Sequence, residues 1–187
     1  MRTNKPELHC CIKPFCLFII LAIIALCGYS SAAMLAEGTA APDFTLKNQD
    51  GADVTLSQEL TRGHVVLYFY PKDNTPGCTK QACSFRDLSE EFRLAGASIF
   101  GVNTDSVKSH KKFHTKNQLT FTLLADPDGK VTKLYGADGW FSLARRVTYL
   151  IDSGGIIRKV YPDVTISTHA AELLQEVRGL SKENTEP

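Results

Sequence analysis

Hydrophobic residues follow two patterns along this chain, one typical of buried strands and the other of amphipathic helices. Two uninterrupted runs rich in β-branched and aromatic residues, 64–70 (HVVLYFY) and 97–103 (ASIFGVN), predict strands that are covered on both faces. A shorter strand is predicted at 121–125. Strands and helices alternate, which favours an α/β fold with a mixed sheet between helices. The helices are predicted at 76–94, 106–116, 130–135 and 167–178.

Turn-forming residues separate two further pairs of short strands. Strands 44–47 and 54–56 flank the segment Asn48-Gln49-Asp50-Gly51, and Asp-Gly is a strong hairpin signal. Strands 147–152 and 156–161 flank Ser153-Gly154-Gly155 in the same way. The pattern therefore predicts an N-terminal β-hairpin and a second hairpin before the last helix.

Composition is that of a globular protein and limits its partners. The chain has 187 residues, of which 43% are hydrophobic and 22% charged, so one domain with a single core is expected. Its 21 basic and 20 acidic residues leave a net charge of +1, which gives no basic field for nucleic acid. Of six cysteines, Cys78 and Cys83 lie within the predicted globular part. The other four are Cys10, Cys11, Cys16 and Cys27.

The N-terminal residues have the pattern of an export signal. A basic start (Arg2, Lys5 and Lys13) precedes the uncharged stretch 15–28, and small residues follow it. These three parts describe a Sec-type signal peptide over 1–33, with cleavage after Ala33. The chain is then expected in an exported compartment, the bacterial periplasm, with 34–187 as its folded domain.

An uncleaved membrane anchor is the alternative for the same segment. Residues 14–36 form 23 consecutive positions without a charge, which is long enough to span a bilayer. In that case the domain is attached to the inner membrane. Either alternative places it outside the cytoplasm.

The segment PKDNTPGCTKQAC, residues 71–83, carries the candidate chemistry. It follows the first long buried strand, and the strand-to-helix junctions of α/β sheets are common ligand sites. Thr75 is expected to cap the helix, Pro76 to open it and Cys78 to stand in its first turn. The positive end of a helix favours thiolate over thiol. Cys78 is therefore predicted to be a nucleophile. The alternative, a buried structural cysteine, fits its polar neighbours poorly.

Cys83 has two interpretations, a static structural disulfide with Cys78 or one half of a catalytic pair. Five residues of helix separate two Cα atoms by roughly 8–9 Å. A disulfide needs less than about 7 Å. The bond therefore requires local unwinding, which favours a catalytic pair. The spacing also differs from the C-x-x-C of exchange enzymes and zinc sites.

The segment YFYPKDNTPGCTKQACSFRD resembles the active-site segment of peroxiredoxins, in particular the atypical two-cysteine Q-type branch, also called bacterioferritin-comigratory proteins. APDFTL, VNTDS, LLADPDGKV and RVTYLID extend the resemblance over essentially all of 34–187. It implies a thioredoxin-like α/β fold, with a central mixed sheet, flanking helices and an N-terminal β-hairpin.

The resemblance also assigns roles to individual residues. It implies that Cys78 is the peroxidatic cysteine and Cys83 the resolving cysteine on the same helix. Pro71 would shield the pocket, Thr75 would hydrogen-bond the peroxide, and Arg146 would be the pocket arginine.

At the arginine this sequence departs from the family. The usual P-G-R is replaced by Ala144-Arg145-Arg146. The spacing to Thr148 favours Arg146, and Arg145 is the alternative.

The activity implied by the resemblance is that of a thiol-dependent peroxidase in antioxidant defence. Hydrogen peroxide or an alkyl hydroperoxide would oxidise Cys78 to a sulfenic acid, and Cys83 would convert it to an intramolecular disulfide. Thioredoxin or a thioredoxin-like dithiol protein would reduce that bond. Neither a metal nor an organic cofactor is implied, and the protein is expected to be a monomer.

Two other functions use the same cysteines: a disulfide-exchange or thiol-chaperone protein, and a binding domain with a structural disulfide. Rapid reaction of the reduced protein with peroxide would distinguish the peroxidase from both of these alternatives.

Three other features have simple interpretations. His110 and His114 have a metal-compatible spacing, but the lysines around them indicate a solvated basic face. Residues 126–129 (DPDG) resemble part of a calcium loop and are expected to form a turn. Trp140 and Phe141 are either an exposed lip or part of the core.

Overall fold

A seven-stranded mixed sheet forms the centre of the computed structural model, which describes residues 33–183. Its strands lie in the order β2-β1-β5-β4-β3-β6-β7. The strands are β1 (Thr45–Asn48), β2 (Asp53–Thr55), β3 (His64–Phe69), β4 (Ala97–Asn103), β5 (Thr122–Ala125), β6 (Val147–Ile151) and β7 (Ile157–Tyr161).

The two long strands predicted from hydrophobic runs occupy the middle of this sheet. β3 is parallel to β4, and β4 is parallel to β5. β6 runs antiparallel to β3 on its other side and pairs with β7. All six residues of β3 are buried, because helices cover both faces of the sheet. The predicted mixed sheet is confirmed.

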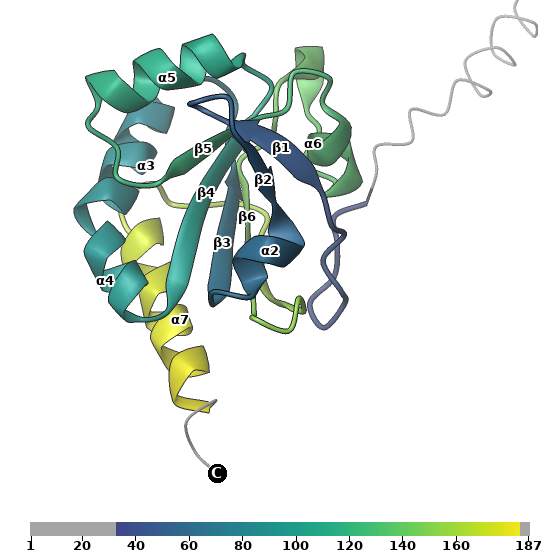
Figure 1. Ribbon diagram of the computed structural model, residues 1–187, viewed down its shortest axis with the longest axis vertical. Helices are drawn as coiled ribbons and strands as arrows, with labels where there is room; N and C mark the ends of the chain where they lie inside the picture. The colour runs from purple at the N-terminus through teal and green to yellow at the C-terminus, as the bar shows by residue number, and fades with distance from the viewer. Residues whose placement is uncertain (1–32, 184–187) are drawn as a thin grey trace, which may run out of the picture. The chain divides into compact units, whose positions relative to one another are not determined.

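Helices pack on both faces of the sheet (Figure 1). α3, α4, α5 and α7 cover one face, and α2 and α6 lie on the other. The helices are α2 (Leu56–Leu60), α3 (Pro76–Asp87), α4 (Ser89–Leu94), α5 (Val107–Lys116), α6 (Lys130–Leu134), the 3-10 helix η1 (Trp140–Ser142) and α7 (His169–Glu183).

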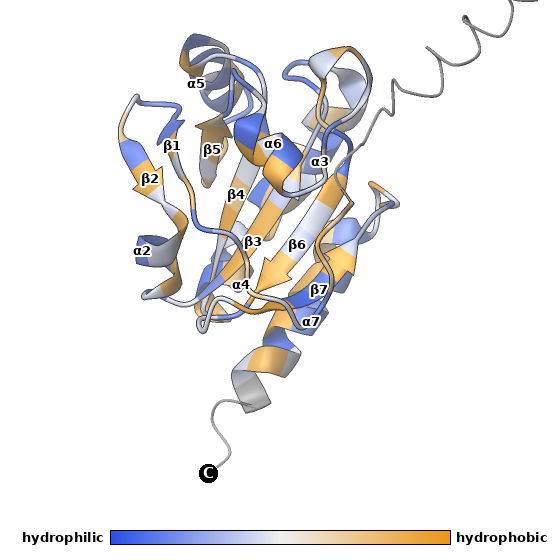
Figure 2. Cartoon of the chain, turned by 90° about the vertical axis from the view of Figure 1, so that its right-hand side faces the viewer, coloured by the Kyte–Doolittle hydropathy of each residue, from blue (hydrophilic) through white to orange (hydrophobic). Residues whose placement is uncertain are grey.

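The alternation of side chains along β3 builds two hydrophobic clusters. Val66 and Tyr68 face α3, α4, α5 and α7, and Cys78 belongs to their cluster. Val65 and Leu67 face α2 and α6. Figure 2 shows the result, with hydrophobic colours on the central strands and hydrophilic colours on much of α5. Burial on both faces makes the sheet the stable part of the molecule.

The N-terminal hairpin is confirmed. Thr45 pairs with Thr55 and Lys47 with Asp53 across β1 and β2. Gly51 in the connecting turn has φ +84°, a conformation that glycine adopts without a steric penalty. The second hairpin, formed by β6 and β7, is also confirmed.

The single helix predicted over 76–94 is wrong, because it is broken at Leu88. This residue has φ −108° and ψ 5°, and α4 begins after it. The hydroxyl of Ser89 donates to the Arg86 carbonyl across 2.8 Å and contacts the Thr120 hydroxyl at 2.6 Å. Serine side chains that bond the backbone in this way compete with helix continuation.

Three smaller differences from the prediction concern helix positions. α2 was not predicted, since its first residue, Leu56, was assigned to a strand. η1 was also not predicted. The last helix begins at His169 and runs to Glu183, so it extends beyond the predicted end at 178.

The turn predicted at 126–129 is confirmed. The Gly129 amide donates to the Asp126 carbonyl, and Gly129 has φ +64°. The Asp126 carboxylate accepts hydrogen bonds from the amide and the hydroxyl of Thr132, both at 2.7 Å. Asp126 therefore holds the start of α6.

The predicted signal or anchor segment and the four N-terminal cysteines lie outside the residues that the structure describes, apart from Ala33 to Ala36 at the end of the anchor range. Between residues 33 and 183, none of the helices has the length and apolar character that a bilayer span requires.

His169, at the start of α7, generates a prediction about acid stability. The ring is buried, and its Nε2 atom lies 2.9 Å from the Thr148 hydroxyl on β6. Burial lowers the pKa of His169 to about 4, from an ordinary value near 6.5. Between these two values the unfolded chain binds more protons, so stability is full above pH 6.5 and falls as the pH drops toward 4.

In the parent protein, the titration of His169 should lower the free energy of unfolding by up to about 3 kcal/mol as the pH falls from 6.5 to 4. We expect His169→Gln to abolish this part of the decrease. Urea unfolding of both proteins at several pH values measures it. Parallel curves of the free energy of unfolding against pH would contradict the assignment.

Candidate active site

Cys78 lies in the first turn of α3, on the side of the helix that faces the sheet. Thr75 has the extended backbone of an N-cap residue, Pro76 opens the helix, and Cys78 is the third helical residue. Its side chain is only 2% exposed. The first intrahelical hydrogen bond runs from the Thr79 amide to the Thr75 carbonyl, so the amides of Gly77 and Cys78 have no acceptor within the helix, as at every helix start. The predicted position of this thiol is confirmed.

Arg146, the residue before β6, contacts the thiol. Its Nη2 atom donates to Cys78 Sγ across 3.4 Å. The sheet register explains this meeting: Phe69, the last residue of β3, pairs with Val147, so Arg146 stands beside the end of β3 where the loop to α3 begins. Arg145 is exposed, because successive residues of an extended chain point in opposite directions. The geometry favours Arg146 over Arg145.

Gln81 completes a chain of contacts that sequence analysis missed. Its side-chain oxygen accepts a hydrogen bond from Arg146 Nη1. Gln81 lies three residues after Cys78, so both side chains point to the buried face of α3. That spacing, a polar residue on the same face as the nucleophile, is the signal that could have identified it. The contact holds the guanidinium group over the thiol.

Two buried polar atoms beside the thiol have no hydrogen-bond partner within residues 33–183: Tyr68 Oη and Gln81 Nε2. Tyr68 belongs to the same core cluster as Cys78 and stacks on Phe85, with ring centroids 4.8 Å apart. Burial raises the pKa of Tyr68 well above its usual value, and the nearby Cys78 adds to the rise. The hydroxyl therefore keeps its proton and can donate a hydrogen bond near the thiol.

Cys83 lies on the same helix as Cys78 but on a different side of it. Both thiols are free, and Cys83 is half-buried. The buried face of α3 consists of Cys78, Gln81, Ala82 and Phe85. Five helical residues turn the chain by roughly 140°, which takes Cys83 off this face. The two cysteines therefore point apart while α3 is intact.

Thr75 and Pro71 lie in the loop before α3, and both are half-buried. The Thr75 hydroxyl donates to the Lys72 carbonyl across 3.1 Å and makes no capping hydrogen bond. Its oxygen lone pairs are therefore available to accept a hydrogen bond from a ligand. Pro71 follows the end of β3 directly.

His110 contradicts the prediction of a solvated basic face. Its side chain is fully buried, with Nδ1 at 3.0 Å from Asp73 Oδ2 and Nε2 at 3.1 Å from the Leu124 carbonyl oxygen. The lysines around it in sequence hid this, although Phe113 three residues later marks the same buried face. His114 is half-buried. Within residues 33–183 no cluster of three or more metal-binding side chains exists.

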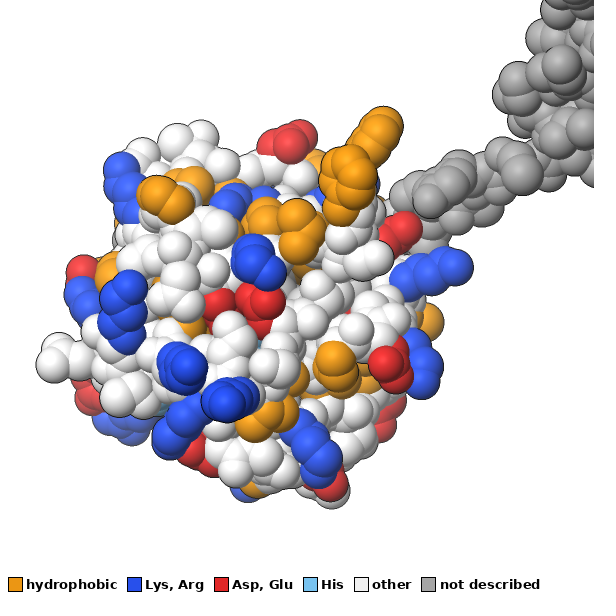
Figure 3. Space-filling view, turned by 90° about the horizontal axis from the view of Figure 1, so that it is seen from above, with side chains coloured by type: hydrophobic (Ala, Val, Ile, Leu, Met, Phe, Trp, Pro, Cys, Tyr) orange, Lys and Arg blue, Asp and Glu red, His pale blue; other side chains and the backbone are white. Residues whose placement is uncertain are grey.

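Trp140 and Phe141 form an exposed lip, so the core alternative is wrong. Their side chains are 86% and 92% exposed. The face drawn in Figure 3 carries both basic and acidic side chains, in keeping with the near-zero net charge.

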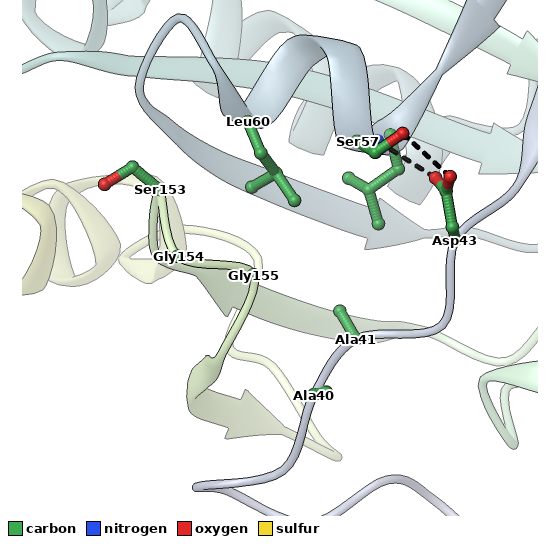
Figure 4. A pocket seen from close by; sticks show the side chains of 9 residues that line it. Ala40, Ala41, Asp43, Ser57, Leu60, Ser153, Gly154 and Gly155 are labelled. Carbon is green, nitrogen blue, oxygen red and sulfur yellow. Dashed lines mark hydrogen bonds between the residues drawn. The ribbon is translucent and has the colours of Figure 1, made fainter.

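A separate pocket of about 310 Å³ lies away from the thiol (Figure 4). Leu60 and the turn of Ser153 and Gly154 line it, and the Ser153 amide bonds His64 at the start of β3. Cys78 follows the opposite end of this strand. The Asp43 carboxylate in the pocket already accepts two hydrogen bonds from Ser57. This pocket therefore supplies no unpaired charged side chain that could act on Cys78.

Comparison with known proteins decides the family. The model of the AhpC/TSA family matches residues 38–160. The chloroplastic peroxiredoxin Q of Oryza sativa subsp. japonica is 50% identical over 129 residues, which cover 68% of this chain and 59% of the relative. The chain belongs to the peroxiredoxin Q branch of the AhpC/TSA family. It matches less than two thirds of the length of that rice relative.

Solved structures of the same branch agree with the fold. Peroxidoxin BcpB of Mycobacterium tuberculosis is similar with a TM-score of 0.74 and 37% identity, over 79% of this chain and 99% of that one. The bacterioferritin comigratory protein of Xanthomonas campestris gives 0.69 and 32%, over 74% and 92%. The expected thioredoxin-like fold is confirmed.

The contact at Cys78 predicts which arginine matters for reaction with peroxide. We expect Arg146→Ala to slow that reaction about 10²–10³-fold, because one lost electrostatic donor costs about 2.7–4 kcal/mol. Arg145→Ala, the matched control, should react at nearly the normal rate. Stopped-flow measurement of peroxide reduction compares them. A larger defect in Arg145→Ala would overturn the geometric choice.

Proposed function

We propose that this chain is a thiol-dependent peroxidase that acts in antioxidant defence, with Cys78 as its peroxidatic cysteine. The observation that carries the proposal is the position of Cys78 Sγ, in the first turn of α3 and 3.4 Å from a guanidinium nitrogen of Arg146. Both the helix start and the cation favour a negatively charged sulfur. The family to which the chain belongs is consistent with this chemistry.

The first step is attack of the Cys78 thiolate on the nearer peroxide oxygen. A sulfur–oxygen bond forms, the O–O bond breaks, and the departing oxygen takes a proton and leaves as water or an alcohol. Arg146 stabilises the charge that develops on the two oxygens. Thr75 accepts a hydrogen bond from the peroxide, since its own proton goes to the Lys72 carbonyl. Pro71 shields the pocket from bulk water.

The second step joins the two cysteines. The thiol of Cys83 attacks the sulfenic acid of Cys78, a disulfide forms, and the hydroxyl group leaves as water. Because the two Cα atoms stand roughly 8–9 Å apart in an intact helix, the first turns of α3 must unwind before this step.

The third step returns the enzyme to its reduced form. A dithiol protein, thioredoxin or a thioredoxin-like protein, attacks the disulfide, becomes oxidised itself and leaves two thiols on this chain. Alkyl peroxide reduction is the activity named for the similar Xanthomonas campestris bacterioferritin comigratory protein. This supports alkyl hydroperoxides, beside hydrogen peroxide, as substrates here. The steps require no metal or organic cofactor.

The proposed place of action is an exported compartment, the bacterial periplasm, reached through a signal peptide over residues 1–33. An inner-membrane anchor over the same segment is the alternative, and the plant relatives are chloroplastic by name. N-terminal sequencing of the protein recovered from cell fractions decides among these fates. The enzyme is proposed to act as a monomer, and light scattering at low micromolar concentration tests this by measuring its molar mass. No nucleic acid is proposed as a partner.

Because the two cysteines have different roles, we expect their serine variants to react differently with peroxide. Cys78→Ser should consume no peroxide, because the nucleophile is gone. Cys83→Ser should react once and stop at the sulfenic acid, since residues 33–183 then hold no second thiol. Intact mass after one equivalent of peroxide measures this: a loss of two hydrogens in the parent, and a trappable gain of one oxygen in Cys83→Ser.

Two results would contradict the proposal. A parent protein that does not react with peroxide would favour a disulfide-exchange or binding function instead. A folded Cys83→Ser that fails in its first turnover would show that Cys83 is needed before, and not after, the oxidation of Cys78.

A further inference from the structure

The side chains of Asp73 and His110 form a buried pair between α5 and the loop that leads to Cys78. Asp73 is in this loop, between the end of β3 and the start of α3, and His110 is on α5. Asp73 is 5% exposed and His110 fully buried. Neither takes part in the proposed thiol chemistry. Two ionisable groups placed together out of water need a reason, because burial of unpaired charge is costly.

The hydrogen bonds of His110 fix where its protons lie. Nε2 is 3.1 Å from the Leu124 carbonyl oxygen, which can only accept, so Nε2 carries a proton. Nδ1 faces both oxygens of Asp73, at 3.0 and 3.2 Å. If that carboxyl group is ionised, Nδ1 must carry a proton as well. The charge of the His110 ring therefore depends on whether the Asp73 carboxyl group is ionised.

Three other donors surround the Asp73 carboxylate. The hydroxyls of Tyr70 and Ser109 each donate to it across 2.7 Å, and the Asn103 amide does so across 3.2 Å. The orientation of Asn103 is fixed, because its oxygen accepts the amide of Asp105. Donors of this kind favour the ionised carboxylate.

Taken together, these effects lower the pKa of the Asp73 carboxyl group. Burial raises the pKa of the carboxyl group, but the hydrogen bond and the electrostatic attraction of His110, together with the hydrogen bonds from Ser109 and Tyr70, outweigh it and hold the pKa below its usual value. The remaining charged groups at this place, Asp105 and Lys72, pair with each other at 3.3 Å. An ionised Asp73 leaves His110 with a proton on each ring nitrogen.

The pair also fastens the loop that precedes the reactive helix. The Asp73 amide donates to Asp105 Oδ2 across 2.8 Å, which ties the loop to the segment after β4. The next residue, Asn74, has φ +58°, a left-handed conformation that few residues other than glycine adopt. Thr75 then caps α3. Asp73 thus ties the loop to α5 and to the segment after β4, five residues before Cys78.

We propose that Asp73 and a doubly protonated His110 form a permanent buried ion pair that positions Cys78 against Arg146 and holds residues 71–75 in place while α3 unwinds. Both are positioning residues, since neither touches the reacting sulfur. The positioning part rests on the proposed peroxidase function, whereas the charge of the pair does not.

Nitrogen-15 NMR of the histidine rings in the reduced protein tests the charge. We expect one ring with two protonated nitrogens, because Nδ1 faces the Asp73 carboxylate and Nε2 faces the Leu124 carbonyl oxygen. This signal should vanish in His110→Gln and persist in His114→Gln, the matched control one helical turn away. If His110→Gln does not fold, through-space contacts to Leu124 and Tyr70 assign the ring. An unprotonated Nδ1 would overturn the ion pair.

Hydrogen exchange tests the fastening without reference to activity. In His110→Gln, amides of residues 72–78 should exchange at least about tenfold faster than in His114→Gln, while β3 is unchanged. If that variant is unfolded, Asp73→Asn serves in its place. Equal protection in folded variants and control would show that the pair does not hold the loop.

Single-turnover kinetics tests the positioning. Formation of the sulfenic acid should slow at least about tenfold in His110→Gln and Asp73→Asn, because small misplacement of reacting groups is expensive. Disulfide formation afterwards should not slow. An unchanged peroxide rate constant in the folded variants would overturn the positioning role, whereas an unreactive parent would instead overturn the proposed peroxidase function.

Discussion

The helix that carries both cysteines is subject to two opposite requirements, and the rest of the structure follows from them. While α3 is intact, its first turn presents Cys78 to the free amides of the helix start and to Arg146. The same intact helix holds Cys83 roughly 8–9 Å away between Cα atoms, too far for a disulfide. The proposed cycle therefore needs an element that is well formed in one state and opens in the next.

The sheet supplies the fixed part of this arrangement. β3 is buried on both faces and hydrogen-bonded to β4 and β6, so it has no reason to open when α3 does. Through its pairing with β6 it also holds Arg146 in place, although this residue and Cys78 lie 68 positions apart in sequence. The first turns of a helix, by contrast, carry few intrahelical hydrogen bonds and are the cheapest part to unwind.

Sequence patterns predicted the features that depend on local order. The hydrophobic runs located β3 and β4, the Asp-Gly turn located the first hairpin, and Thr-Pro-Gly-Cys placed the thiol at a helix start. The spacing before Thr148 favoured Arg146, and the contact with Cys78 agrees with that choice.

Two of the misses, the break at Leu88 and the burial of His110, have a common cause, which is contact with residues far away in the chain. The break at Leu88 depends on Ser89, whose hydroxyl meets Thr120. The burial of His110 depends on Asp73 and Leu124, and nothing in its lysine-rich neighbourhood indicates them. Such contacts exist only after the sheet has assembled, so a local pattern does not report them.

The most direct test of this account is hydrogen exchange on the reduced protein and on its peroxide-oxidised form. We expect faster exchange of amides 76–84 in the oxidised form, because closing the Cys78–Cys83 bond has to open the start of α3, and unchanged protection across β3. Equal protection of 76–84 in both forms would contradict the account. The partner of Cys78 would then be a thiol from another molecule, and α3 would have no need to unwind.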